Sequence, residues 1–158
     1  SSEPSPFDSG EPSMDGGTRP GIWISDTHCN VFQAGVYLQN VLQGIISNML
    51  IYKAPDSSED CAGVRLSRCS DLKMHHSIFV SQSRKGSFVG LLTENGTVRC
   101  QISDNTFEWC NESIHLGMGT SGCHVWDNQV QGGGSGVCVD EGERNRFRAL
   151  GVDSWGSV

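Results

Sequence analysis

Short segments of alternating apolar and polar residues recur along the chain from Gly21 onward. One type has a small residue followed by an aliphatic residue, a variable residue and a further aliphatic residue or threonine. Its first aliphatic position falls at residues 36, 64, 91, 114 and 137, which gives steps of 28, 27, 23 and 23 residues. Because alternation with a period of two marks a strand with one buried face, the pattern predicts a β-strand in each of five repeats. The five copies are Gly35-Val36-Tyr37-Leu38, Gly63-Val64-Arg65-Leu66, Gly90-Leu91-Leu92-Thr93, Ser113-Ile114-His115-Leu116 and Gly136-Val137-Cys138-Val139.

A second motif lies between copies of the first, and its small polar position falls at residues 48, 77, 105 and 128. The two motifs keep an offset of 12 to 14 residues, and turn-forming residues fill the segments between them. An antiparallel β-sandwich also has short, regularly spaced strands, but it does not predict two motifs that share one period. A repeat of about 23 residues without helical periodicity predicts an all-β chain, a right-handed parallel β-helix of about four to five coils.

Stacked coils bring equivalent residues together, because neighbouring strands of a sheet lie about 4.8 Å apart. The second motif therefore predicts a column of hydrogen-bonded polar side chains at one bend, formed by Asn48, Ser77, Asn105 and Asn128. Two polar segments lengthen their coils, and we expect residues 53–60 and 82–87 to leave the stack as loops.

The composition divides the chain into three parts. Residues 1–20 are rich in Ser, Pro, Gly, Glu and Asp and lack a hydrophobic period, which predicts a flexible N-terminal arm or linker. The repeats predict one β-helix domain over residues 21–150, followed by a C-terminal tail over residues 151–158. A length of 158 residues suits a single core.

The charge balance and the cysteines limit the partners and cofactors. Eleven basic and 18 acidic residues give a net charge of -7 without a long basic run, so we expect no nucleic-acid partner and no anionic membrane surface. The apolar stretches are too short for membrane insertion. The seven cysteines form no zinc-type cluster, so neither a metal nor another cofactor is expected. We expect free buried thiols, which fits synthesis in a reducing cytosol.

The chain resembles the pectin-lyase-like β-helix superfamily, and bacteriophage tailspikes in particular, in units such as Gly21-Ile22-Trp23-Ile24-Ser25, Gly35-Val36-Tyr37-Leu38-Gln39-Asn40 and Ile102-Ser103-Asp104-Asn105-Thr106-Phe107. The resemblance covers about residues 21–150. It implies a virion-attached homotrimer, made in the host cytoplasm, that binds and often cleaves a polysaccharide or cell-surface glycan. No catalytic signature matches residue for residue, so the resemblance transfers no active site.

Alignment of the first motif predicts two outward columns, Tyr37, Arg65, Leu92, His115 and Cys138, and Gln39, Ser67, Glu94, Gly117 and Asp140. Glu94 and Asp140 would then lie two coils apart, roughly 9 to 10 Å along the stack, near the upper limit for the acid and base of an inverting glycosidase. They are the candidate catalytic pair. His115, Arg65 and Tyr37 are candidate substrate-binding residues on the same face.

Two tryptophans, Trp109 and Trp126, are further candidates for substrate binding, because an exposed aromatic face can stack on the apolar face of a sugar ring. Packing under a loop or at a subunit interface would explain them equally well. Carboxylates usually point outward without a catalytic role, and the alternatives to the candidate pair are Glu108, Glu112 and Asp127. The doublet His75-His76 lies at a turn and lacks a third ligand for a metal site.

These observations favour a glycan-recognising β-helix segment of a tailspike-type receptor-binding protein, with depolymerase activity as a glycoside hydrolase or polysaccharide lyase if the carboxylates are catalytic. One alternative is a secreted polysaccharide lyase, hydrolase or epimerase of a cellular organism, although such enzymes usually have more coils. The other is a structural β-helix module without a ligand.

Overall fold

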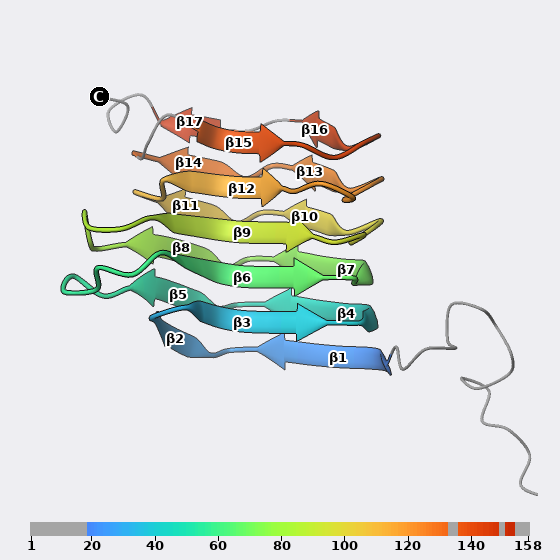
Figure 1. Cartoon of the computed structure of the whole chain (residues 1–158), viewed down its shortest axis with the longest axis horizontal. Helices are drawn as coiled ribbons and strands as arrows, with labels where there is room; N and C mark the ends of the chain where they lie inside the picture. Colours follow the sequence, from blue (N-terminus) through green and yellow to red (C-terminus); the bar gives the residue numbers. More distant parts are fainter. Residues whose placement is uncertain (1–18, 133–135, 149–150, 154–158) are drawn as a thin grey trace, which may run out of the picture.

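The computed structural model describes residues 19–132, 136–148 and 151–153, which form 17 strands in three parallel sheets, here named A, B and C (Figure 1). Sheet A contains β1 (Arg19–Ser25), β4 (Val41–Ser47), β7 (Ser70–His75), β10 (Gln101–Ser103), β13 (His124–Trp126) and β16 (Arg146–Arg148). Sheet B contains β2 (His28–Val31), β5 (Leu50–Lys53), β8 (Ile78–Ser81), β11 (Thr106–Glu108), β14 (Gln129–Gln131) and β17 (Gly151–Asp153). Sheet C contains β3 (Ala34–Gln39), β6 (Cys61–Ser67), β9 (Phe88–Glu94), β12 (Glu112–Leu116) and β15 (Gly136–Asp140).

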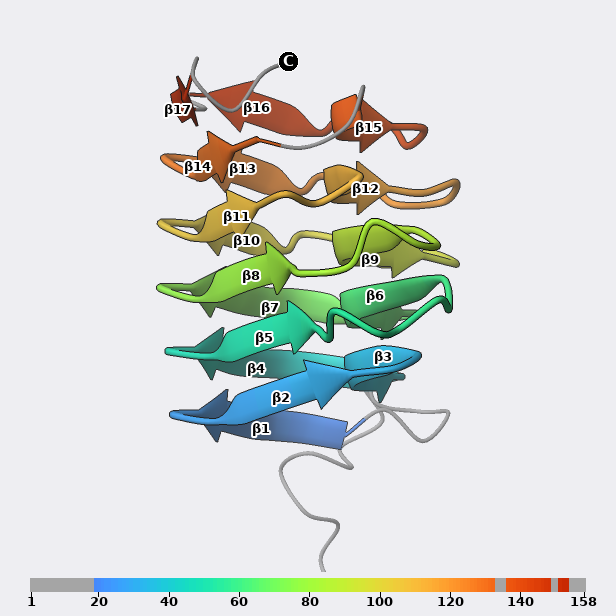
Figure 2. The ribbon, with the colours of Figure 1, turned by 90° about the vertical axis from the view of Figure 1, so that its left-hand side faces the viewer.

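The chain visits sheets A, B and C in the same order on every coil. β1, β2 and β3 form the first coil, and each following set of three strands repeats the path one level further along the stack (Figure 2). Five complete coils and two strands of a sixth result, and the predicted all-β parallel β-helix of about four to five coils is confirmed. The described ranges contain no helix that could span a membrane.

The ends of the stack differ slightly from the expected domain limits. β1 begins at Arg19, and β17 at Gly151–Asp153 pairs with β14, so strands occur on both sides of the range 21–150. The expected N-terminal arm lies outside the described residues up to residue 18, as does the end of the expected tail from residue 154.

The strand pairing of sheet C agrees with the predicted repeat except at the last coil. The first four copies of the first motif pair in the predicted register. Ile114 of the fourth copy pairs with Cys138, so the expected equivalence with Val137 is wrong by one residue. The preceding residues 132–136 are four glycines and a serine, which carry no apolar side chain that would fix the register in the sequence.

Every second residue of a strand points into the coil and stacks on its equivalents. The central column of sheet B is formed by Ile51, Phe79, Phe107 and Val130, none of them more than 2% exposed. The rings of Phe79 and Phe107 stack with their centroids 4.8 Å apart. Full burial of one such side chain stabilises the fold by roughly 1.5 to 3 kcal/mol, so each column contributes several kcal/mol.

The small residue that opens the first motif makes room for this aromatic column. A Cβ added to Gly63 would lie 2.6 Å from the ring of Phe79 and 2.7 Å from the carbonyl oxygen of Gly90. A Cβ added to Gly90 would collide with the ring of Phe107. The glycines of sheet C and the phenylalanines of sheet B are therefore two sides of one packing contact.

The polar column at the bend between sheets A and B contains three of the four predicted residues. Asn128 Oδ1 accepts hydrogen bonds from the backbone N and the Nδ2 of Asn105, both at 3.0 Å, and Asn105 Oδ1 accepts one from the backbone N of Ser77 at 3.0 Å. Ser77 Oγ accepts the next from the backbone N of Met49 at 3.2 Å. Met49 thus occupies the place predicted for Asn48, which instead is exposed with a left-handed φ of 52°. Asparagine tolerates the left-handed conformation and also suits the hydrogen-bonded column, so its residue type could not decide between the two positions.

A buried lysine joins the two loops that were expected to leave the stack. Lys53 ends β5 and is 0% exposed. Its Nζ donates hydrogen bonds to the carbonyl oxygens of Glu59 at 2.6 Å, Lys85 at 2.6 Å and Ser87 at 3.2 Å. The assignment of Lys53 to an exposed loop is therefore wrong, because its three donors are satisfied inside by the loops themselves.

All seven cysteines have free thiols, and five of them are buried, which confirms that they pack as small apolar residues. Burial raises the pKa of the Cys110 thiol, and it raises the pKa of the half-buried Cys138 to about 11. These thiols are therefore poor nucleophiles near neutral pH.

Candidate functional site

The predicted site lies on the outer face of sheet C, where alternate side chains point to solvent. One outward column contains Tyr37, Arg65, Leu92, His115 and Val139. The structure thus brings together three of the predicted substrate-binding residues, Tyr37, Arg65 and His115. Val139 occupies the place predicted for Cys138, which packs against the core because of the one-residue shift.

Arg65 links its two neighbours on this face. Its Nε donates a hydrogen bond to Glu94 Oε1 at 2.7 Å, and its Cζ lies 5.0 Å from the centroid of the Tyr37 ring. The hydrogen bond with Glu94 raises the pKa of Arg65 further above its ordinary value. Glu94, the first member of the candidate catalytic pair, therefore forms an ion pair with Arg65.

Asp140, the second member, does not lie in the column of Glu94. It pairs with Leu116, in a column whose other members are buried, and it occupies the end of that column. There its Oδ1 accepts hydrogen bonds from the backbone N of Gly142 at 3.0 Å and from Asn145 Nδ2 at 2.8 Å. The predicted placement of Glu94 and Asp140 in one outward column is wrong, because the strand register at the last coil differs by one residue from the predicted one.

The more developed cluster on sheet C surrounds His115. Its Nδ1 lies 2.6 Å from Glu112 Oε2, and its Nε2 lies 2.6 Å from Glu141 Oε1. Burial disfavours the charged imidazole, but the hydrogen bonds with both carboxylates outweigh it and raise the pKa of His115. Glu112 was one of the alternatives to the predicted pair, whereas Glu141 was missed because the shifted register gave its outward place to Asp140.

This cluster is not arranged as a metal centre. The two ring nitrogens of an imidazole point in opposite directions, so Glu112 and Glu141 approach His115 from opposite sides and share no common point. Within the part of the chain that the structure describes, no group of three His, Cys, Asp or Glu side chains is placed to hold a metal ion.

The two predicted tryptophans lie away from the outward columns of sheet C. Trp109 follows β11 with a left-handed φ of 58°, and its ring covers Gly132, where a Cβ would approach within 2.6 Å. Trp126 lies on sheet A with its ring 4.6 Å from that of His124. Each tryptophan ring therefore packs on a neighbouring residue with part of its surface, although Trp109 remains 57% exposed.

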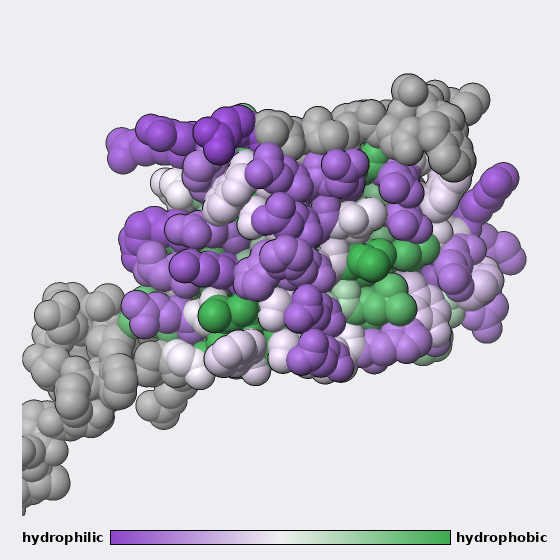
Figure 3. All heavy atoms as spheres, turned by 180° about the vertical axis from the view of Figure 1, so that it is seen from behind, coloured by the Kyte–Doolittle hydropathy of each residue, from purple (hydrophilic) through white to green (hydrophobic). Residues whose placement is uncertain are grey.

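A groove that the sequence did not predict lies on the outer face of sheet A and has a volume of about 540 Å³. One of its walls is an outward column of Trp23, Ile45, Lys73 and Gln101. Trp23 is 72% exposed and is the most exposed aromatic side chain of the described residues. In Figure 3, a small hydrophobic area lies toward the β1 end of this face, and hydrophilic residues cover its β16 end.

The opposite wall contains Gln43, Asp71 and Arg99, all with left-handed backbone conformations at φ values of 62°, 57° and 52°. Arg99 donates two hydrogen bonds to the Asp71 carboxylate, at 2.9 and 2.8 Å. A left-handed residue interrupts the alternation of a strand, so this column is displaced from the regular pleat beside it. Trp23, Ile45 and Lys73 occupy the same place in successive repeats, and this was the only sequence signal for the groove. The signal is weak because outward residues differ in chemical type from one repeat to the next.

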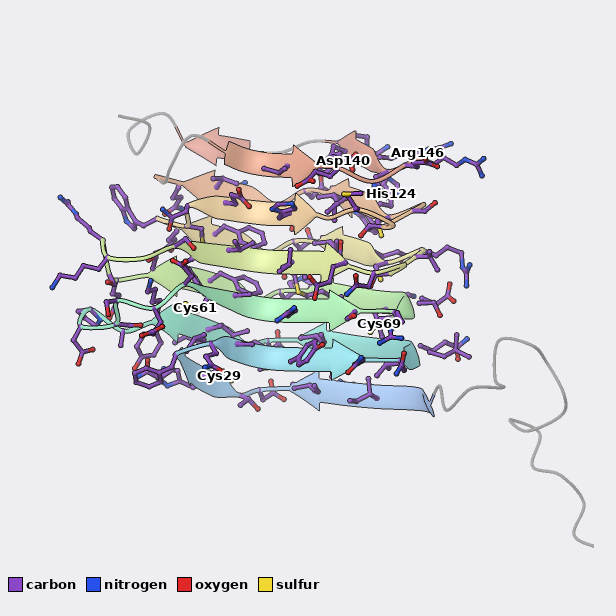
Figure 4. The ribbon with its side chains drawn as sticks, in the orientation of Figure 1. Cys29, Cys61, Cys69, His124, Asp140 and Arg146 are labelled. Carbon is purple, nitrogen blue, oxygen red and sulfur yellow. The ribbon has the colours of Figure 1, made fainter. Side chains whose placement is uncertain are left out.

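A second cleft of about 480 Å³ continues the groove toward β16 and shares Asp71, Arg99 and Gln101 with it. Its remaining lining includes His124, Arg144 and Arg146. Figure 4 shows His124 and Arg146 on neighbouring strands at one side of the stack. The outer face of sheet A therefore carries one continuous groove, with apolar residues such as Trp23 and Ile45 at its β1 end and charged residues toward β16.

The comparisons with known proteins agree with this architecture. The sequence profile of the family described as "Right handed beta helix region" matches residues 7–130. No curated protein and no solved structure matches the chain. The profile covers most of the sequence, and the strands it spans form a parallel β-helix, so the chain belongs to the right-handed β-helix family.

Proposed function

We propose that the chain binds a glycan along the outer face of sheet A. The observation that carries this proposal is the groove that Trp23 shares with Gln43, Gln101, Lys73 and Arg99. A sugar ring has apolar C–H faces and a rim of hydroxyl groups, so its binding site combines an aromatic surface with several polar side chains. The groove offers both within one surface.

The groove suits a chain of sugars better than a single ring. Six strands stacked about 4.8 Å apart give sheet A a face of roughly 24 Å along the stack. Trp23 lies on the first of these strands and Gln101 on the fourth. A polysaccharide lying parallel to the stack would meet both.

The proposed setting is a tailspike-type receptor-binding protein of a virion, assembled as a homotrimer in the host cytoplasm. Family membership, the resemblance of the repeats to tailspikes and the seven free thiols support this setting, because a reducing compartment keeps thiols free. A secreted lyase, hydrolase or epimerase with this fold is the alternative. A detergent-resistant trimer favours the virion protein, and a monomer that cleaves polysaccharide favours the cellular enzyme.

Cleavage of the glycan is a second candidate function, and the His115 cluster is the observation that favours it. A protonated imidazole between two carboxylates can donate a proton to a leaving oxygen while a carboxylate acts as base or nucleophile. In the proposal His115 is the acid and Glu112 or Glu141 is the base or nucleophile, in place of Glu94 and Asp140, which lie in different columns.

Retention of bacterial surface and plant cell-wall polysaccharides on an array tests glycan binding. We expect Trp23→Ala to weaken retention about tenfold, a change of ~1.4 kcal/mol, which is in the range of one aromatic contact. Trp109→Ala is the matched control, since Trp109 is also exposed but lies outside the groove. Retention of no glycan, or equal retention by the wild type and Trp23→Ala, contradicts the proposal.

Release of reducing ends or unsaturated sugars tests cleavage separately. His115→Gln should abolish release while leaving retention unchanged, because His115 lies on sheet C. Release that persists in His115→Gln assigns the chemistry to other residues.

A further inference from the structure

Positive charge is concentrated in the second cleft of sheet A, although the chain as a whole carries a net charge of -7. Three arginines, Arg99, Arg144 and Arg146, line this cleft of about 480 Å³ together with His124. Asp71 is the only acidic residue in the lining. An excess of two positive charges therefore remains when the imidazole is counted as neutral.

The ion pairs leave two of the arginines available. Arg99 is engaged by Asp71 through two hydrogen bonds. Neither Arg144 nor Arg146 forms an ion pair with any carboxylate among residues 19–132 and 136–148 that the structure describes. Both are exposed, so their guanidinium groups are accessible from solvent.

The backbone leaves open space between these cations. Arg99, Gly122 and Arg144 follow one another in the left-handed column on successive coils, with φ values of 52°, 67° and 57°. A Cβ added to Gly122 would meet only Arg99 Cγ, at 3.7 Å. The middle coil therefore contributes no side chain to this column, and Arg99 and Arg144 lie roughly 9.6 Å apart along the stack, on either side of the gap.

The neighbouring outward column provides the third side of the gap. His124 pairs with Arg146 in the strand register, so their side chains stand on adjacent coils next to Gly122 and Arg144. Guanidinium groups present paired N–H donors that match the oxygens of carboxylate, sulfate and phosphate groups. The three arginines of the cleft repel one another, and a bound anion would relieve that repulsion.

We propose that this cleft binds an oxyanion substituent of the glycan that lies in the adjoining groove. The inference rests on the proposed function and names its substrate class: an acidic polysaccharide bearing carboxylate, sulfate or phosphate groups. The apolar part of a sugar ring stacks on Trp23 at one end of sheet A, and the anionic group lies over Gly122 between Arg99, Arg144 and Arg146.

Two probes separate a glycan-borne anion from a free one. Inorganic sulfate is titrated into the full chain while backbone amide chemical shifts of residues 122–124 and 144–146 are followed. Dextran sulfate and unmodified dextran are then compared for retention. We expect sulfate to shift these amides and dextran sulfate to be retained at least tenfold better than dextran.

The double variant Arg144→Gln/Arg146→Gln should lose both effects. Arg84→Gln/Lys85→Gln is the matched control, because it removes the same charge from a loop outside the cleft. Equal loss in both double variants shows a nonspecific charge effect and overturns the site. Sulfate shifts without preferential retention of dextran sulfate overturn the assignment to a glycan.

Failure of the proposed function gives a different result. If sulfate and dextran sulfate bind through the arginines but no polysaccharide depends on Trp23, the groove is not a sugar site, and the cleft does not serve the proposed glycan. If a neutral polysaccharide depends on Trp23 while sulfate does not bind, glycan binding stands and the acidic substrate class is refuted.

Discussion

The hydrogen-bonded column at the bend between sheets A and B gives a sharp test of the fold through the substitution Asn128→Ala. Asn128 is 0% exposed and forms four hydrogen bonds. Its Oδ1 accepts from the backbone N and Nδ2 of Asn105, and its Nδ2 donates to the carbonyl oxygens of Ile102 at 3.0 Å and Trp126 at 3.1 Å. Alanine removes all four and leaves the buried backbone N–H of Asn105 without this acceptor.

The expected loss of unfolding free energy follows from these contacts. An unsatisfied buried donor costs about 1 to 3 kcal/mol, and a lost hydrogen bond whose partner finds another acceptor costs about 1 kcal/mol. The Nδ2 of Asn105 keeps an acceptor after the substitution, because it also donates to the carbonyl oxygen of Met74 at 3.2 Å. Asn128→Ala should therefore destabilise the chain by about 2 to 4 kcal/mol.

Asn48→Gly is the control, because the motif places Asn48 in the same column whereas the structure places it outside. Glycine adopts the left-handed conformation of Asn48 without strain, so a change within about 0.5 kcal/mol is expected. Urea unfolding followed by circular dichroism measures both variants, and hydrogen exchange at residues 103–106 localises the effect if coils unfold separately. An unchanged Asn128→Ala, or an equal loss in Asn48→Gly, would refute the register described here.

Three further outcomes are expected. Because the pKa of His115 is raised in the folded state, its cluster stabilises the fold below the unfolded pKa of 6.5, and this stabilisation is lost as the pH rises through the folded pKa. Urea unfolding at a series of pH values should therefore show the largest loss of unfolding free energy for His115→Gln below pH 6.5 and the smallest at alkaline pH. Lys53→Met removes the hydrogen bonds from Nζ to the carbonyl oxygens of Glu59, Lys85 and Ser87, and it should speed limited proteolysis within residues 55–60 and 82–87. Unchanged cleavage would show that other contacts hold the loops. Gly63→Ala should lower the free energy of unfolding by about 1 to 3 kcal/mol through its clash with Phe79, and so lower the thermal midpoint, whereas Ser87→Ala should not.

The fold was predictable because its signal is repeated. Inward residues such as Val64 and Leu91 pack against their equivalents on the next coil, so each repeat must supply an apolar residue at the same place. The glycine that opens the motif is constrained in the same way by the phenylalanine ring behind it. Two such constraints with one period leave few alternatives to a β-helix.

The groove on sheet A could not be predicted from the same signal. Outward residues face solvent and need no equivalent on the next coil, so Trp23, Ile45 and Lys73 share a column without sharing a chemical type. The clefts also depend on left-handed residues such as Arg99 and Arg144, whose conformation their residue type does not favour. Only the strand register shows that these side chains adjoin.

Register also decides what a polar residue can do in this fold. In a strand, a shift of one residue exchanges the inward and outward faces. The register predicted from the sequence places Asp140 outward, whereas the observed register places it in an inward column and gives the outward place to Glu141. In the observed register Asp140 ends an inward column and accepts hydrogen bonds from Gly142 and Asn145, whereas Glu141 forms a hydrogen bond with His115 on the outer face. Both carboxylates lie on the fifth coil, where glycines precede the strand and weaken the sequence signal. An acidic residue in a β-helix is therefore a candidate for chemistry only after its column is known, and His115 with its two carboxylates meets that condition where the pair Glu94 and Asp140 does not.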